Sequence, residues 1–174
     1  MTDTPDTPNT PDTPETPNTP DPDRTPRPTP TSASSPSTPD PRTAAEATDA
    51  ACDTFRDNLE AMATGSYLRP DDLELWEPPY PPSVVTDADA AVRDLVTTAR
   101  TAVDQGTGTI TLDLCDAVAT AVARLRGISD AHGGAVLEEE EIADVTAVLA
   151  ALSDETGADA EVVLTHAQTL LDEE

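Results

Sequence analysis

The sequence predicts an all-α protein, a small bundle of four to five helices preceded by a disordered, acidic tail rich in Thr-Pro. Two observations lead to this fold class. Apolar residues after position 43 recur at helical spacing in several segments that end near glycines. Thirteen of the 18 prolines lie before Arg42, in a stretch without such a pattern. We therefore divide the chain into a tail, residues 1–42, and a helical domain, residues 43–174, of the usual size for one domain.

The tail is a repeat. Between residues 2 and 30, Thr-Pro recurs about every three positions, mostly followed by Asp, Asn or Glu. Proline removes backbone donors and disfavours helix at the residue before it. The segment offers almost no apolar side chains whose burial would offset the entropy of ordering. We expect residues 1–42 to be extended and disordered, and a Pro-rich ligand for an aromatic groove is an alternative.

The first predicted helix begins at Thr43 and ends at Gly65. Thr43 and Glu46 have the spacing of a capping box, which satisfies two backbone N–H groups at a helix start. Glycine is a common residue just beyond a helix end. The side chains predicted to face the core lie on one stripe at helical spacing. They are Ala44, Thr48, Ala51, Cys52, Phe55, Leu59 and Met62.

Residues 66–83 break this pattern and form an irregular connector. They contain five prolines and three of the four aromatic residues of the chain, Tyr67, Trp76 and Tyr80. Large amphipathic side chains of this kind dominate the energetics of protein interfaces. These three are therefore candidate partner-binding residues. The alternative is that they fold back as a lid over a core that is otherwise poor in aromatic side chains.

A second helix is predicted from Thr86 to Gly106. Its predicted inward residues are Ala88, Val92, Leu95, Ala99, Ala102 and Val103. Residues 107–114 alternate apolar and polar side chains, as strands do, but an isolated strand would have no partner. We therefore favour a third helix that includes this segment and ends before Gly127, with Arg124 and Arg126 near the negative end of its dipole.

The acidic run Glu138–Glu141 opens the fourth predicted helix, and a fifth follows Gly157. Acidic side chains in a first turn complement the positive end of the helix dipole. The alternative is a divalent cation held by Glu138 and Glu141, although hard cations need several converging oxygens. Cys52, Cys115, His132 and His166 raise the further alternative of a zinc site, with a spacing that matches no familiar finger. We expect no bound cofactor.

Acidic residues far outnumber basic ones, with 35 Asp and Glu against nine arginines and no lysine, for a formal charge of -26. Residues 44–174 hold 28 of these acids and six arginines, a net charge of -22. Such repulsion opposes folding in dilute buffer, whereas about 1 M salt shortens the Debye length to about 3 Å. The composition resembles that of proteins from haloarchaea, which keep molar salt in the cytosol. Arginine-rich codon bias in an actinobacterium or its phage would explain the missing lysine but not the charge.

The absence of lysine excludes a P-loop phosphate lysine, Schiff-base chemistry and a lysine general base. Binding to nucleic acid loses its usual attraction to phosphate and is disfavoured. The N-terminus resembles no secretion signal, and the longest apolar run, 147–152, is too short to span a bilayer. We expect a cytoplasmic protein without a membrane partner.

The sequence contains no set of residues typical of a catalytic centre, so it favours protein–protein interaction over catalysis. The expected partner is an unknown protein or a second copy of the chain, contacted through the aromatic connector. Two alternatives stay open. One is a carboxylate-based metal-binding domain or Mg-dependent enzyme that uses Glu138 and Glu141. The other is a transcriptional regulator built on the last two helices, or an acidic mimic of DNA.

Overall fold

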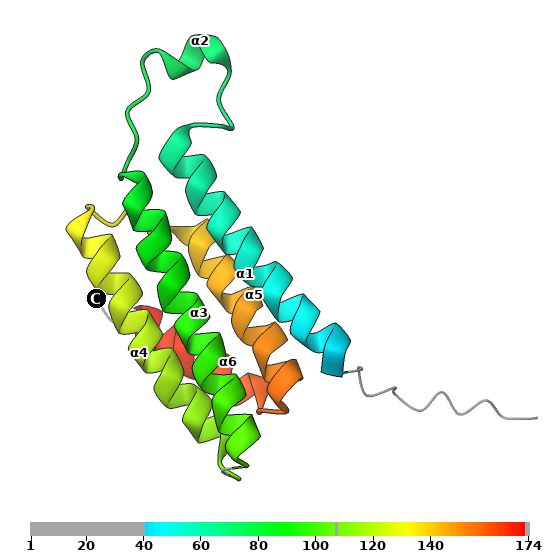
Figure 1. Ribbon diagram of the computed structural model, residues 1–174. Coiled ribbons are helices and arrows are strands. Elements are labelled where there is room, and N and C mark those ends of the chain that lie inside the picture. Colours follow the sequence, from blue (N-terminus) through cyan, green and yellow to red (C-terminus); the bar gives the residue numbers. More distant parts are fainter. Residues whose placement is uncertain (1–40, 107, 173–174) are drawn as a thin grey trace, which may run out of the picture. The chain divides into compact units, whose positions relative to one another are not determined.

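A computed structural model describes residues 41–106 and 108–172, and within these ranges every regular element is a helix. Figure 1 shows their arrangement. The helices are α1 (Pro41–Thr64), α2 (Pro70–Leu73), α3 (Pro82–Gln105), α4 (Ile110–Ala131), α5 (Glu139–Thr156) and α6 (Ala160–Asp172). The all-α prediction is therefore confirmed. The predicted disorder of the tail falls, for residues 1–40, outside the described residues.

Five long helices pack side by side, whereas α2 lies apart from them. α1 packs mainly on α5 and also on α3, while α3 packs on α4, as Figure 1 shows. α6 covers α4 and α5. The shared core consists chiefly of Val, Leu and Ala side chains, with Phe55 and Tyr80 as its two fully buried aromatic residues in the described part of the chain. Small side chains let these helices approach closely. Close approach stabilises the bundle because dispersion attraction acts only at short range.

Two helices begin earlier than the sequence predicted, each at a proline. α1 begins at Pro41, so Thr43 lies inside the helix and does not cap it. α3 begins at Pro82, before the predicted start at Thr86, and this shortens the connector. The fixed φ of proline suits the first helical position, where its missing N–H costs nothing. Proline therefore starts helices at Pro41 and Pro82, in addition to its expected effect of interrupting them.

Residues 110–114 are helical, as favoured, because α4 begins at Ile110, whereas residues 108 and 109 precede the helix and residue 107 lies outside the described residues. The predicted end before Gly127 is wrong, since α4 continues to Ala131. The helix beyond Gly127 buries Ser129, whose Oγ accepts hydrogen bonds from the backbone N–H groups of Val136 and Leu137 at 3.3 and 3.1 Å. These contacts outweigh the cost of a glycine inside a helix, about 1 kcal/mol.

Arg124 and Arg126 consequently do not cap α4. Arg124 forms an ion pair with Asp94 of α3 at 2.7 Å, and Arg126 donates a hydrogen bond to the carbonyl oxygen of Leu171 in α6 at 2.7 Å. Both arginines therefore join α4 to a neighbouring helix. Val103, predicted to face the core, is exposed near the end of α3.

Arg93 and Arg100 of α3 join further helices. Arg100 donates through Nε and Nη2 to Glu155 of α5 at 2.6 and 3.1 Å, and through Nη2 to Asp49 of α1 at 2.9 Å. Arg100 thus joins α3 to both α5 and α1 at one point. Arg93 contacts Asp89 in its own helix and Asp53 of α1, at 2.9 and 2.8 Å. These pairs oppose the repulsion among carboxylates where helices meet.

The described helices include none that combines the length and the apolar character needed to cross a membrane.

Candidate functional site

The connector, defined from here on as residues 65–81, leaves the end of α1 and returns to the start of α3. Its only regular element is α2, which lies beyond the ends of α1 and α3 in Figure 1. Gly65 adopts φ 67°, a left-handed conformation that glycine tolerates best, and this ends α1. Successive turns follow, with Leu68 N–H donating to Gly65 O at 2.9 Å and Trp76 N–H donating to Leu73 O at 3.3 Å. The connector thus has a defined local fold.

Gly65 is also the residue against which Leu73 and Trp76 of the connector pack. A Cβ atom at this position would lie 2.8 Å from Leu73 Cδ1 and 2.8 Å from Trp76 Cε3. Side chains from both later turns therefore cover Gly65, which is buried, and Trp76 is half-buried. A larger residue at position 65 would displace them.

Tyr80 attaches the end of the connector to the bundle. Its side chain is 2% exposed, and its hydroxyl donates a hydrogen bond to the carbonyl oxygen of Leu59 at 3.3 Å. Burial, and secondarily the nearby carboxylates of Glu141 and Glu138, raises the pKa of Tyr80 to about 12. The hydroxyl is therefore protonated and acts as a donor near neutral pH. The sequence allowed two interpretations, a partner-binding surface or a lid that folds back over the core. The burial of Tyr80 agrees with the lid.

Tyr67 lies in the opposite environment, with its side chain 56% exposed. Two leucines that the sequence analysis did not single out are exposed on the same connector, Leu73 at 45% and Leu75 at 92%. The three predicted partner-binding residues therefore have three environments: Tyr80 in the core, Trp76 half-buried and Tyr67 at the surface. Leu75, between Glu74 and Trp76, belongs to no periodic pattern, so the sequence offered no signal for its exposure.

The connector also carries exposed carboxylates. Asp71, Asp72, Glu74 and Glu77 are exposed on the connector, whose single basic residue is Arg69. The shortest nitrogen–oxygen distance between Arg69 and Asp72 is 3.9 Å, and both side chains are largely exposed. An exposed pair at this distance adds little stability. The connector thus presents exposed apolar and exposed acidic side chains on the same segment.

The two carboxylates of the predicted metal site lie at the start of α5 but in different environments. Glu138 is exposed and occupies the N-cap position, whereas Glu141 is 3% exposed. Burial raises the pKa of Glu141, although hydrogen bonds from the backbone N–H groups of Glu141 and Glu138 oppose the rise. Glu141, the third residue of the helix, therefore reaches back to the helix start, as the acidic residue of a capping box does.

Within residues 41–106 and 108–172, no three His, Cys, Asp or Glu side chains lie close enough together to hold a metal ion. The structure thus supplies Glu138 and Glu141 with no third ligand among the described residues, and the metal site stays a prediction.

Cys52 is buried, and burial raises the pKa of its thiol to about 11. That thiol is protonated at neutral pH and is a poor nucleophile.

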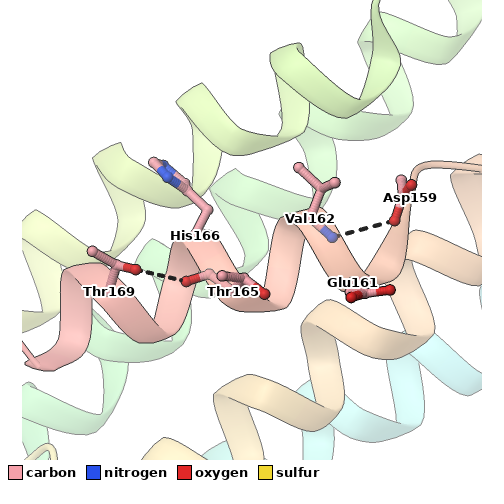
Figure 2. A pocket seen from close by; sticks show the side chains of 6 residues that line it. All are labelled: Asp159, Glu161, Val162, Thr165, His166 and Thr169. Atoms are coloured by element: carbon pink, nitrogen blue, oxygen red, sulfur yellow. Dashed lines mark hydrogen bonds between the residues drawn. The ribbon is translucent and has the colours of Figure 1, made fainter.

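The side of α6 bears an open hollow of about 460 Å³. Figure 2 shows the six side chains that line it, all from α6 or the residue before it: Asp159, Glu161, Val162, Thr165, His166 and Thr169. Their polar contacts stay local, since Asp159 Oδ1 accepts from Val162 N–H at 3.2 Å and the Thr169 hydroxyl donates to Thr165 O at 2.9 Å. The hollow therefore shows no convergence of groups from different elements.

Comparison of the chain with protein-family models, with curated proteins and with solved structures finds no match.

Proposed function

We propose that this protein acts through protein–protein contact, and that the connector is its contact surface. One observation carries the proposal: an internally packed projection exposes Leu75, Tyr67 and Leu73 outside the bundle. Exposed apolar clusters on ordered loops are typical of interaction sites. A prearranged loop also loses less conformational entropy on binding than a flexible one.

We further propose that the contact forms in a cytosol with molar salt. The support is the net charge of -22 on residues 44–174, which about 1 M salt screens beyond about 3 Å. Apolar contacts gain strength in such salt, whereas charge attraction over long distances is lost. The exposed apolar side chains of the connector are therefore suited to form a contact in brine.

Site-specific photo-cross-linking tests the proposed contact surface. A photoreactive amino acid replaces Leu75 in the full-length chain, and a second variant carries it at Leu112, an exposed leucine of α4. Both are irradiated in lysates of the producing cells at high KCl. We expect a discrete cross-linked protein, either a partner or a second copy, from position 75 and none from position 112. Identical products from the two positions, or none from position 75, would contradict the proposal.

A further inference from the structure

The apolar and charged side chains of the connector indicate the chemistry of its partner, an inference that rests on the proposed function. Its apolar groups occupy one short stretch, from Tyr67 through Leu73 to Leu75. α2 has at most a marginal contact with the other helices, so the bundle leaves this element uncovered. The packing of Leu73 and Trp76 on Gly65 and the burial of Tyr80 hold both ends of the stretch in place.

The charge around this stretch has one sign. Four exposed carboxylates face a single cation, Arg69, which approaches Asp72 only to 3.9 Å. In the part of the chain that the structure describes, no ion pair within 4.0 Å engages Asp71, Glu74 or Glu77. By contrast, carboxylates where helices meet are neutralised by Arg93 and Arg100. The connector thus keeps negative charge that the bundle does not compensate.

Complementarity of charge decides among the possible occupants. A second copy would place its own carboxylates directly against the same carboxylates, at separations where salt screens repulsion least. Anionic lipid and nucleic acid would likewise approach with negative charge. A basic partner would instead gain short charge-assisted hydrogen bonds, which persist at high salt better than attraction over long distances does.

We infer that the connector binds a partner protein whose apolar surface is bordered by arginine or lysine side chains. Leu75, Leu73 and Tyr67 contact the apolar part of that surface. Asp71, Glu74 and Glu77 accept hydrogen bonds from its basic border. An amphipathic helix with leucines on one face and arginines beside them is the simplest probe with this chemistry.

Binding of such a synthetic peptide, free of tryptophan, tests the inference. Trp76 is the only tryptophan of the chain, so its fluorescence reports binding at the connector. Titrations use the full-length chain at the lowest KCl concentration that gives complete helical circular dichroism. The twin peptide keeps the leucines and carries glutamate in place of arginine. We expect saturable binding of the basic peptide and no measurable binding of its acidic twin.

Two pairs of matched variants locate the contact. One neutralised variant combines Asp71→Asn, Asp72→Asn, Glu74→Gln and Glu77→Gln in the connector. Its control removes the same charge from exposed positions of the bundle through Glu46→Gln, Asp104→Asn, Asp130→Asn and Glu161→Gln. We expect about tenfold weaker binding for the connector variant and a change below about twofold for the control. Leu75→Ser should likewise weaken binding about tenfold, whereas Leu112→Ser should not.

Three results would overturn the inference while leaving the cross-linking test of the contact surface intact. The first is equal weakening by both neutralised variants, which would mean diffuse attraction to the whole acidic surface. The second is failure of the basic peptide to bind, or equal binding by its acidic twin. The third is a dimer mass in native mass spectrometry that Leu75→Ser abolishes, since the occupant would then be a second copy of this chain.

Discussion

Gly65 shows how much one residue contributes to the connector. It satisfies two requirements at once, a φ of 67° and the absence of a Cβ atom beneath Leu73 and Trp76. Gly106 ends α3 with a similar φ of 62°, but a Cβ atom there would have no atom within 4 Å other than those of its local backbone and chain neighbours. Both glycines have a left-handed backbone, but only Gly65 lies beneath packed side chains. Comparing substitutions at the two positions therefore separates the effect of backbone conformation from the effect of side-chain packing.

Gly65→Ala should destabilise the protein more than Gly106→Ala. The left-handed conformation costs about 1–2 kcal/mol for alanine at either position. Displacement of Leu73 and Trp76 adds about 1–3 kcal/mol at position 65. Chemical denaturation measures both losses, and Trp76 emission should shift to longer wavelength only in Gly65→Ala. Equal losses with unchanged emission would mean that the connector does not pack on Gly65.

Glu141 is a second residue with a testable effect, because its carboxyl group is buried and its pKa is raised. The folded state then binds a proton more tightly than the unfolded state does. Stability linked to this group is therefore fully present below the unfolded pKa and is lost as pH rises through the folded pKa. At neutral pH the ionised form costs stability.

Glu141→Gln should therefore be more stable than the wild type at pH 7, with the gain disappearing below about pH 4. Glutamine can retain the hydrogen bond to the helix start. Glu140→Gln, at an exposed position in the same turn, is the control and should give no gain. Unfolding curves across this pH range measure the difference. A loss of stability in Glu141→Gln at pH 7 would show that its charge is favourable.

Residue patterns explain which parts of the structure could be predicted. Phe55 and Leu59 lie on a helical stripe and are buried, as predicted. Glu141 also belongs to such a stripe, four residues before the buried Val145, but its place in an acidic run concealed this. Within the connector, periodicity does not apply, so no sequence rule separated the buried Tyr80 from the exposed Tyr67.

At the scale of elements, arginine side chains join the helices. Arg100 contacts Glu155 and Asp49, so a single residue of α3 binds both α5 and α1. Burial alone would raise the pKa of Glu155, but hydrogen bonds from Arg100 and Thr48, with the charge of Arg100, leave it below its usual value. The stability linked to Glu155 is present above its unfolded pKa and is lost as pH falls through its folded pKa.

Arg100→Met should destabilise the protein by about 1–3 kcal/mol, because the mostly buried Glu155 carboxylate loses its charged partner. Arg56→Met is the control, since Arg56 pairs only with its exposed neighbour Asp57 among the described ion pairs, and it should cause no measurable loss. Denaturant unfolding measures both. The double variant Arg100→Met/Glu155→Gln should recover part of the loss. Equal losses of stability for the two arginine substitutions would mean that the contacts of Arg100 with Glu155 and Asp49 add no stability.

At the scale of the whole molecule, two features coexist: a bundle with a net charge of -22 over residues 44–174 and an apolar projection. The arginine pairs between helices reduce repulsion where the helices meet. Elsewhere the exposed carboxylates repel one another, and salt is the means of screening them. We propose that this acidic surface suits the protein to brine, while the connector carries the contact.

The dependence of unfolding on KCl concentration tests this claim most directly. Circular dichroism follows the bundle and Trp76 fluorescence follows the connector in one denaturation series, from about 0.2 M to about 2 M KCl. We predict that the free energy of unfolding rises steadily with KCl and that both signals change together. An unfolding free energy that is already maximal at the lowest salt and does not rise would contradict the claim.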